Sequence, residues 1–219
     1  MLSRTSELIR NGRPVRIVLY GDSITEVDRT PGYFGGASCR EKNWGWQLRD
    51  QLAKAFPSGR WEVASFGIGG QNAFEGLGRL DWLRPLAPDL VLVSFGANDC
   101  GYHFLPPDAT AQALAALVDG IRALYQADVV IMGMGADNPQ SPCFVHREET
   151  LAAIEKVAAE KRAPYVNTRR AILQATRDGR AWADYHTNAQ DCHPNDAGHA
   201  VWAAAAAEVI QGELKGNPA

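Results

Sequence analysis

Four short segments, far apart along the chain, carry residue types that acyl-transfer chemistry requires. Ser23, in a Gly-Asp-Ser sequence, offers a hydroxyl that can act as a nucleophile once a base removes its proton. His193, which is followed by proline, offers an imidazole that can act as this base. Gly70, in a glycine-rich segment, and Asn98, in a Gly-Ala-Asn-Asp segment, offer N–H groups for a developing oxyanion. Together they predict a nucleophile, a base and an oxyanion hole.

Each segment on its own also has a structural interpretation. Gly-Asp-Ser and Asn-Asp are common in turns, where their side chains satisfy backbone groups. The glycine-rich segment could form a plain turn or a dinucleotide-binding loop. The second of these fits badly, because Asn72 stands at the sixth position of the fingerprint and Asp89 begins the next strand instead of ending it. The combination of the four segments is what favours catalysis.

Alternating strand and helix patterns predict how these segments come together. Apolar runs typical of buried parallel strands lie at 15–20, 61–66, 90–95, 129–134 and 165–166. Apolar residues recur at helical spacing in 46–56, 74–83, 114–124 and 151–157, and an alanine-rich helix is expected at about 196–214. This alternation predicts an α/β protein with a parallel sheet covered by helices on both faces.

The loops that leave the carboxyl ends of the strands are expected to form one rim, where ligands of such sheets bind. Ser23, Gly70 and Asn98 each follow a predicted strand. The proline after His193 disfavours helix at the histidine, so the imidazole lies in a loop just before the final helix. Three of the rim loops are long and rich in Gly, Pro, Asn and aromatic residues, which is typical of functional loops: 21–43, 96–107 and 133–146.

Length and composition exclude several classes of protein. The chain has 219 residues, of which 46% are hydrophobic and 21% charged, and it has no Pro-, Gly- or Ser-rich linker, so we expect a single domain over 1–219. A formal charge of −3 with scattered basic residues provides no basic stripe for nucleic acid. The apolar runs are far shorter than the roughly 20 residues that span a bilayer. We therefore expect neither a nucleic-acid nor a membrane partner.

The amino-terminal sequence and the cysteines indicate the cellular compartment of the protein. Residues 1–10 lack the apolar core of a secretory signal, which favours a cytoplasmic protein, or a secreted one if the sequence is a mature form. Cys39, Cys100, Cys143 and Cys192 show no CxxC spacing, and free thiols are the simplest interpretation. Cys100 and Cys192 each adjoin one of the four segments, so a disulfide between these two at the rim stays open.

The four segments, in this order, resemble the sequence blocks of the SGNH or GDSL-type serine hydrolases, over nearly the whole chain from about Val15 to the final helix. The resemblance implies a flavodoxin-like three-layer sandwich with a five-stranded parallel sheet, and ester hydrolysis without a metal or an organic cofactor. It also implies that Ser23 is the nucleophile and His193 the base. The N–H groups of Ser23 and Gly70 and the side chain of Asn98 would then form the oxyanion hole.

One position departs from this family pattern. The last block of the family has an aspartate three residues before the histidine, where this chain has Gln190, whereas Asp191 stands two residues before His193. We expect Asp191 to orient the imidazole, because a loop can absorb a shift of one residue. Asp184 or a backbone carbonyl could do so instead. Without any acid, the catalytic group would be a Ser–His dyad.

The substrate is specified only weakly by the sequence. Aromatic rings on the rim suit either sugar stacking or an acyl pocket. No long apolar groove is evident in the loops, so we expect short acyl groups such as acetyl, carried by a carbohydrate. The candidate pocket residues are Asp22, Tyr33, Phe34, Tyr102, Phe104 and Phe144.

Three other functions stay open. A lipase or thioesterase would act on longer acyl chains with the same catalytic residues. A metal-dependent phosphoesterase lacks its usual paired Asp-x-His and Gly-Asn-His segments here. Its candidate ligands are Asp22, Asn98, Asp99 and His193. A carbohydrate-binding module without catalysis would keep the aromatic rim but would not need the Ser23 hydroxyl.

Overall fold

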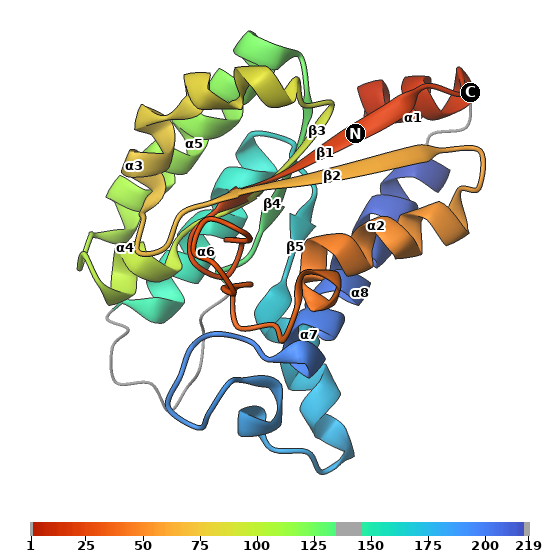
Figure 1. The fold of residues 1–219 in the computed structure, drawn as a ribbon. Helices are drawn as coiled ribbons and strands as arrows, with labels where there is room; N and C mark the ends of the chain where they lie inside the picture. Colours follow the sequence, from red (N-terminus) through yellow and green to blue (C-terminus); the bar gives the residue numbers. More distant parts are fainter. Residues whose placement is uncertain (1, 135–145, 217–219) are drawn as a thin grey trace.

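A parallel β-sheet forms the centre of the protein, as seen in a computed structural model that describes residues 2–134 and 146–216 (Figure 1). Its strands are β1 (Pro14–Gly21), β2 (Arg60–Gly67), β3 (Leu90–Ser94), β4 (Asp128–Met132) and β5 (Tyr165–Val166). All neighbouring strands are parallel, and their order in the sheet is β2-β1-β3-β4-β5. This is the flavodoxin-like order, so the predicted fold class is confirmed.

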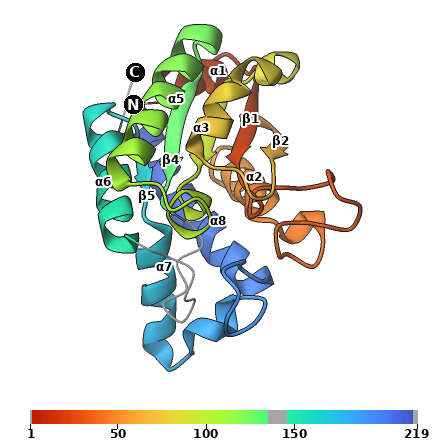
Figure 2. The same ribbon diagram turned by 90° about the vertical axis from the view of Figure 1, so that its left-hand side faces the viewer.

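Helices cover both faces of this sheet. The α-helices are α1 (Ser3–Arg10), α2 (Trp44–Ala55), α3 (Ala73–Gly78), α4 (Ala97–Gly101), α5 (Pro107–Tyr125), α6 (Arg147–Glu160), α7 (Thr168–Ala175) and α8 (Asp196–Lys215). Short 3-10 helices are η1 (Arg40–Lys42), η2 (Leu80–Leu86), η3 (Thr176–Asp178) and η4 (Trp182–Tyr185). One layer contains α3, α5 and α6, and the other contains α2 and α8 (Figures 1 and 2).

The sheet is apolar on both faces because both faces are covered. Every residue of β3 and of β4 is buried. The largest side chains that pack against the strands are fully buried as well, among them Trp44 of α2 and Trp202 of α8. On the other face, the ring of Tyr20 meets that of Phe95 edge-on, with centroids 5.4 Å apart. These contacts join the strands and both helical layers into one continuous core.

The helix predicted over 74–83 is wrong in its extent, because the chain breaks at Arg79 between α3 and η2. The side of α3 that faces the core carries Gly76, not the predicted Phe74, which is 44% exposed. A Cβ at Gly76 would lie 2.6 Å from the Phe95 ring, so the absence of a side chain there lets the helix approach the core closely. Pro85 lies inside η2, one residue before its end.

The helix α1 closes the end of the sheet that lies opposite the rim, and the sequence pattern did not indicate it. Its Arg4 forms an ion pair with Asp89 at 2.6 Å, and the backbone N–H of Thr5 donates to the Asp128 carboxylate at 2.8 Å. Both acids lie where β3 and β4 begin.

Among the described residues, the structure has no helix long and apolar enough to cross a membrane.

His199 is a buried link between three parts of the chain. Its Nδ1 accepts a hydrogen bond from the backbone N–H of Trp44 at 3.2 Å, and its Nε2 donates to the carbonyl of Gly35 at 2.9 Å. These two bonds require the neutral imidazole, and burial lowers the pKa of His199 from 6.5 to about 4. The histidine thereby holds the loop after β1 and the start of α2 against α8.

This burial predicts a pH-dependent stability. As the pH falls from 6.5 to about 4, the unfolded chain binds a proton at His199 while the native chain does not, so the free energy of unfolding decreases. The decrease attributable to this histidine approaches about 3 kcal/mol, since one pKa unit corresponds to about 1.4 kcal/mol. In His199→Gln, which cannot bind that proton, this part of the pH dependence should vanish.

Thermal melting across this pH range measures the effect. His146→Gln is the matched control, because His146 is an exposed histidine. An equal pH dependence in wild type and His199→Gln would contradict the structural role of the buried imidazole.

Candidate active site

The nucleophile candidate Ser23 lies in a tight turn that follows β1. The backbone N–H groups of Thr25 and Glu26 donate to the carbonyl of Asp22 at 3.1 and 3.0 Å. Gly21 ends β1, and the backbone of β3 comes too close to it to allow a side chain. A Cβ at this position would lie 2.5 Å from the carbonyl oxygen of Ser94. The absence of this side chain lets β1, β3 and the turn meet, and it brings Ser23 to the rim of the sheet.

His193 reaches the same rim from the other end of the sequence, in the loop before α8. Asn195 fixes this loop, because its Oδ1 accepts from the backbone N–H groups of Ala197 and Gly198 at 3.0 and 3.1 Å and so caps the helix. The Nδ2 of Asn195 donates to the carbonyl of His186 at 2.9 Å. Figure 1 shows the loop after β1, α4 and the loop before α8 gathered at the carboxyl end of the sheet.

Ser23, His193 and Asp191 form a continuous chain of hydrogen bonds. The Nε2 of His193 lies 2.8 Å from the Oγ of Ser23, which is 170 residues away in sequence. The Nδ1 of His193 lies 2.7 Å from the Oδ1 of Asp191. Because a carboxylate can only accept, Nδ1 carries the proton and Nε2 is left to accept from the serine hydroxyl.

Asp191, and not Asp184, is the acid beside the imidazole. Asp184 accepts from the backbone N–H of Ala181 at 2.8 Å, at the start of η4. Burial alone would raise the pKa of Asp191, but hydrogen bonds from Thr187 Oγ1 and from the side chain and backbone N–H of His193 hold this pKa well below its usual range. The carboxylate is therefore ionised. Thr187, which the sequence did not single out, is one of its donors.

Three N–H donors belong to residues that line one cavity, Ser23 among them. Within the described residues, the backbone N–H groups of Ser23 and Gly70 have no hydrogen-bond acceptor, and both residues line one cavity with Asn98. Gly70 has a φ of +78°, which favours glycine. One N–H of the Asn98 amide donates to the carbonyl of Gln71 at 3.0 Å, which leaves its second N–H for a ligand. This arrangement can bind an oxyanion.

The glycine-rich loop between β2 and α3 is held rigidly on both sides. The Glu26 carboxylate accepts from the backbone N–H of Gly69 at 2.7 Å, and the Nε2 of His103 lies 3.0 Å from the carbonyl oxygen of Gly70. Both carboxylate oxygens of the buried Asp99 lie 3.2 Å from the backbone N–H of Ala73, the first residue of α3. The sequence did not identify Glu26 and His103, although Glu26 follows Ser23 by one helical turn.

A cavity of about 540 Å³ opens above the serine. Of the predicted pocket residues, Asp22, Tyr33 and Tyr102 line it, whereas Phe34 and Phe104 do not. Phe144 lies outside the described residues. The ring of Tyr33 stands edge-on to the His193 imidazole, with centroids 6.3 Å apart, and burial raises the pKa of its hydroxyl to about 12. Tyr33 is therefore neutral beside the His193 imidazole.

Thiol and metal chemistry fit these side chains poorly. Burial and the nearby carboxylates raise the pKa of the Cys192 thiol to about 12, which makes it a poor nucleophile and a poor ligand. Ligand-type atoms of Asp191, Cys192 and His193 lie within 4.8 Å of one another, but those of Asp191 and His193 already bond to each other. No disulfide joins Cys100 to Cys192, and Cys143 lies outside the described residues.

The sheet order and the contact between a serine after β1 and a histidine before α8 agree with the fold and site that the resemblance to SGNH or GDSL-type hydrolases implied. A family model described as the GDSL-like Lipase/Acylhydrolase family matches residues 19–201. The chain therefore belongs to this family of ester hydrolases, as its four segments implied. The match includes both Ser23 and His193.

Solved structures share this fold at low sequence identity, while a comparison with curated proteins finds no match. A two-domain esterase active on acetylated mannans is 21% identical, with a TM-score of 0.77, and the alignment covers 100% of this chain but 55% of that one. The chain thus spans about half the length of that esterase. A lipase/acylhydrolase from Enterococcus faecalis is 22% identical, with a TM-score of 0.70 and coverages of 94% and 100%.

A third similar structure is Axe2, an acetyl-xylooligosaccharide esterase from Geobacillus stearmophilus. It is 20% identical, with a TM-score of 0.70, and the alignment covers 90% of this chain and 94% of that one. At such identities these structures establish the fold that the chain shares with them.

Asp22 is a buried carboxyl group directly before Ser23. Burial raises its pKa from 3.8 to about 6, against the effects of a hydrogen bond from the backbone N–H of Ile24 and of the nearby His193. Between pH 3.8 and about 6 the unfolded chain releases this proton while the native chain keeps it, so stability falls as the pH rises through this range. Above about pH 6 this loss of stability stays constant.

Asp22→Asn should remove this deficit, because the amide keeps the acceptor for Ile24 and cannot ionise. We expect the variant to be more stable than wild type at alkaline pH, by at most about 3 kcal/mol at about 1.4 kcal/mol per pKa unit. The difference should disappear below pH 3.8, where the Asp22 carboxyl group of wild type is protonated in both the native and the unfolded chain. Denaturant unfolding at several pH values measures it, with the exposed Asp81→Asn as control. A variant that is less stable at all pH values would refute the burial effect.

Proposed function

We propose that the protein is a serine esterase that forms an acyl-enzyme, with Ser23 as nucleophile, His193 as general base and Asp191 as the orienting acid. The observation that carries this proposal is the hydrogen-bond chain from Asp191 through His193 to Ser23, at 2.7 and 2.8 Å. These distances are within reach for proton transfer. The orientation follows from the ionised Asp191, which retains the proton on Nδ1 and leaves Nε2 basic.

The reaction proceeds in two steps, formation of the acyl-enzyme and its hydrolysis. The Nε2 of His193 takes the proton of Ser23 Oγ as Oγ bonds to the ester carbonyl carbon, and the carbonyl electron pair moves to oxygen. When the tetrahedral intermediate collapses, the bond from carbon to the alcohol oxygen breaks, and His193 gives its proton to the leaving alcohol. A water molecule, deprotonated by His193, then attacks the acyl carbon, the bond from this carbon to Ser23 Oγ breaks, and His193 gives its proton to Oγ. This releases the carboxylic acid and restores the Ser23 hydroxyl.

The oxyanion hole in this mechanism consists of the backbone N–H groups of Ser23 and Gly70 and the second N–H of Asn98. Loss of one such donor typically costs about 3 kcal/mol of transition-state stabilisation. The donors are positioned before the substrate arrives, because Glu26 holds Gly69 and the Gln71 carbonyl holds Asn98. Little reorganisation is then needed as charge develops on the substrate oxygen.

For the substrate, we propose a short acyl group, such as acetyl, on a carbohydrate. A cavity of about 540 Å³ is the size of sites that hold compact ligands. The rings of Tyr33 and Tyr102 line it together with Glu26, Thr30 and Gln190, a combination that suits the apolar faces and the hydroxyl groups of a sugar. Two of the similar proteins are an esterase active on acetylated mannans and an acetyl-xylooligosaccharide esterase, which supports this choice of substrate.

Covalent labelling tests the nucleophile. A fluorophosphonate should attach to Ser23, because only a hydroxyl activated by a neighbouring base reacts quickly with it. Mass mapping of the labelled peptide measures this, and Ser23→Ala should abolish both labelling and ester hydrolysis. Cys192→Ser is the matched control and should keep both. Rapid labelling of the Ser23→Ala variant at another residue would refute the assignment.

A series of esters tests the substrate class. Among nitrophenyl esters, kcat/KM should be highest for acetate and should fall by about tenfold or more for long acyl chains, because a site of limited size excludes added methylenes. Acetylated mannan and xylan oligosaccharides should release acetate. A maximum at long acyl chains would favour the lipase or thioesterase alternative while leaving the serine mechanism intact.

A further inference from the structure

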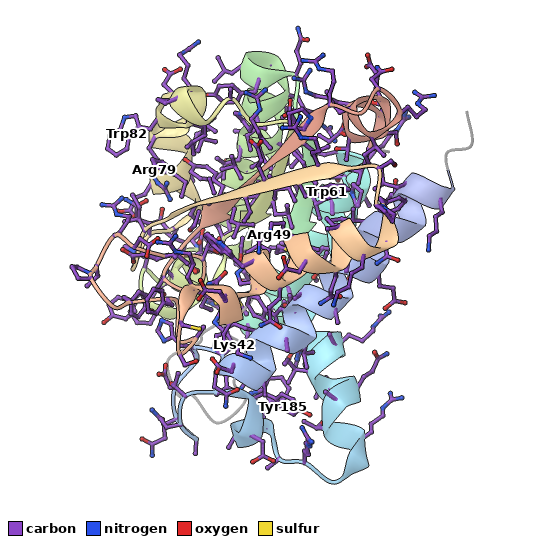
Figure 3. The ribbon with its side chains drawn as sticks, turned by 45° about the vertical axis from the view of Figure 1, so that its right-hand side comes forward. Lys42, Arg49, Trp61, Arg79, Trp82 and Tyr185 are labelled. Atoms are coloured by element: carbon purple, nitrogen blue, oxygen red, sulfur yellow. The ribbon has the colours of Figure 1, made fainter. Side chains whose placement is uncertain are left out.

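Arg79 is an unusual residue, because it is a buried cation that forms no ion pair with any acid in the described part of the chain. It lies at the break between α3 and η2 (Figure 3) and is 3% exposed. Its three hydrogen bonds to the described residues all go to neutral oxygens. Arginines are rarely buried unless they are paired, since removing the charge from water is costly. A buried arginine of this kind needs a structural or functional explanation.

Three segments that lead to the oxyanion donors Ser23 and Gly70 converge on this guanidinium. The Nη2 donates to the carbonyl of Gly21 at 3.0 Å, and Gly21 lies two residues before Ser23. The Nη1 donates to the carbonyl of Phe66 at 2.8 Å, near the end of β2. The Nε donates to the side-chain Oε1 of Gln71 at 2.6 Å. One planar group thus joins the ends of two strands to the glycine-rich loop.

Gln71 connects this guanidinium to the other two oxyanion donors. Its backbone follows Gly70 directly, and its carbonyl accepts from Asn98 Nδ2 at 3.0 Å. If Gln71 shifts, Gly70 N–H and Asn98 Nδ2 shift with it. Arg79 does not line the cavity, so it can act on the reaction only through these neighbours.

We propose that Arg79 is a positioning residue that fixes the positions of the three oxyanion donors, Ser23 N–H, Gly70 N–H and Asn98 Nδ2, relative to one another. The proposal rests on the proposed esterase function. It assigns to this arginine a role in the transition state and none in binding the substrate. Its loss should therefore lower kcat and leave KM nearly unchanged.

The surroundings explain why the residue is arginine and not lysine. The guanidinium lies over the rings of Tyr20 and Phe66, 4.4 and 5.0 Å from their centroids, and such faces attract a planar cation. Burial lowers its pKa to about 10, which still leaves it charged at neutral pH. A lysine ammonium has no planar fork and cannot direct three N–H groups to these three acceptors at once.

The experiment compares Arg79→Met and Arg79→Lys with wild type on a nitrophenyl acetate. Fluorophosphonate titration counts the folded active sites, and assays are run well below the melting temperature of each variant. We expect kcat per titrated site to fall about 10- to 100-fold in Arg79→Met, because small displacements of catalytic groups have effects of this size. KM should stay within about twofold, as for a group that acts only in the transition state. Arg79→Lys should recover part of the loss.

Two further variants separate positioning from stability. Arg122→Met is the matched control, because Arg122 also donates to a backbone carbonyl, that of Lys161 at 2.7 Å, and lies on α5 away from the cavity. It should keep the wild-type kcat. Gln71→Leu removes the side-chain link between Arg79 and the loop and should lower kcat by itself. The double variant with Arg79→Met should then lose less than the product of the two single effects.

Hydrogen exchange provides a readout that does not depend on activity. In Arg79→Met, the backbone N–H groups of residues 67–73 should exchange faster, while those of β3 and β4 should not change. A wild-type kcat per site in Arg79→Met, or unchanged exchange in that segment, would overturn the proposal. If wild type hydrolyses no ester and Ser23 is not labelled, the esterase function fails, and the exchange result alone decides whether Arg79 holds the loop.

Discussion

The hydrogen bond between Ser23 and His193 is the interaction on which the rest of the site depends. It spans 170 residues and joins the turn after the first strand to the loop before the last helix. Neither partner can reach the other unless the parallel sheet is complete, because β1 lies inside the sheet and α8 packs on one of its faces. The core that orders the sheet is therefore also what brings Ser23 and His193, the proposed nucleophile and base, together.

Each end of this bond is held in place by further hydrogen bonds. Asn195 fixes the loop of His193 by capping α8, and Thr187 donates to the carboxylate of Asp191. On the serine side, the carbonyl of Asp22 accepts from two backbone N–H groups that form the turn. Supporting bonds of this kind reduce the reorganisation that catalysis would otherwise require.

The same region concentrates buried ionisable groups that oppose stability. The protein buries the Asp22 carboxyl and the Arg79 guanidinium beside the rim. Burial raises the pKa of Asp22 and lowers that of Arg79, which favours the neutral form of each group. Residues at functional sites are often retained at a cost in stability, because the site needs their charge or their geometry. Here the guanidinium joins three segments, a function that an apolar side chain of similar size cannot perform.

The periodic patterns of the chain were sufficient to predict the parallel α/β fold and the loops that carry Ser23, Gly70, Asn98 and His193, because burial on both faces and helical spacing are visible over a few residues. The roles of Glu26, Arg79 and His199 were not predictable in this way. Each of them bonds to at least one partner that is distant in sequence, at 43, 58 and 164 residues respectively, and a polar side chain in a local window resembles a solvent-exposed one. The choice of Asp191 over Asp184 and the break of the helix at Arg79 likewise depended on three-dimensional packing. A hydrogen bond between distant segments has no local periodicity, so it becomes definite only when the folded chain excludes water from both partners.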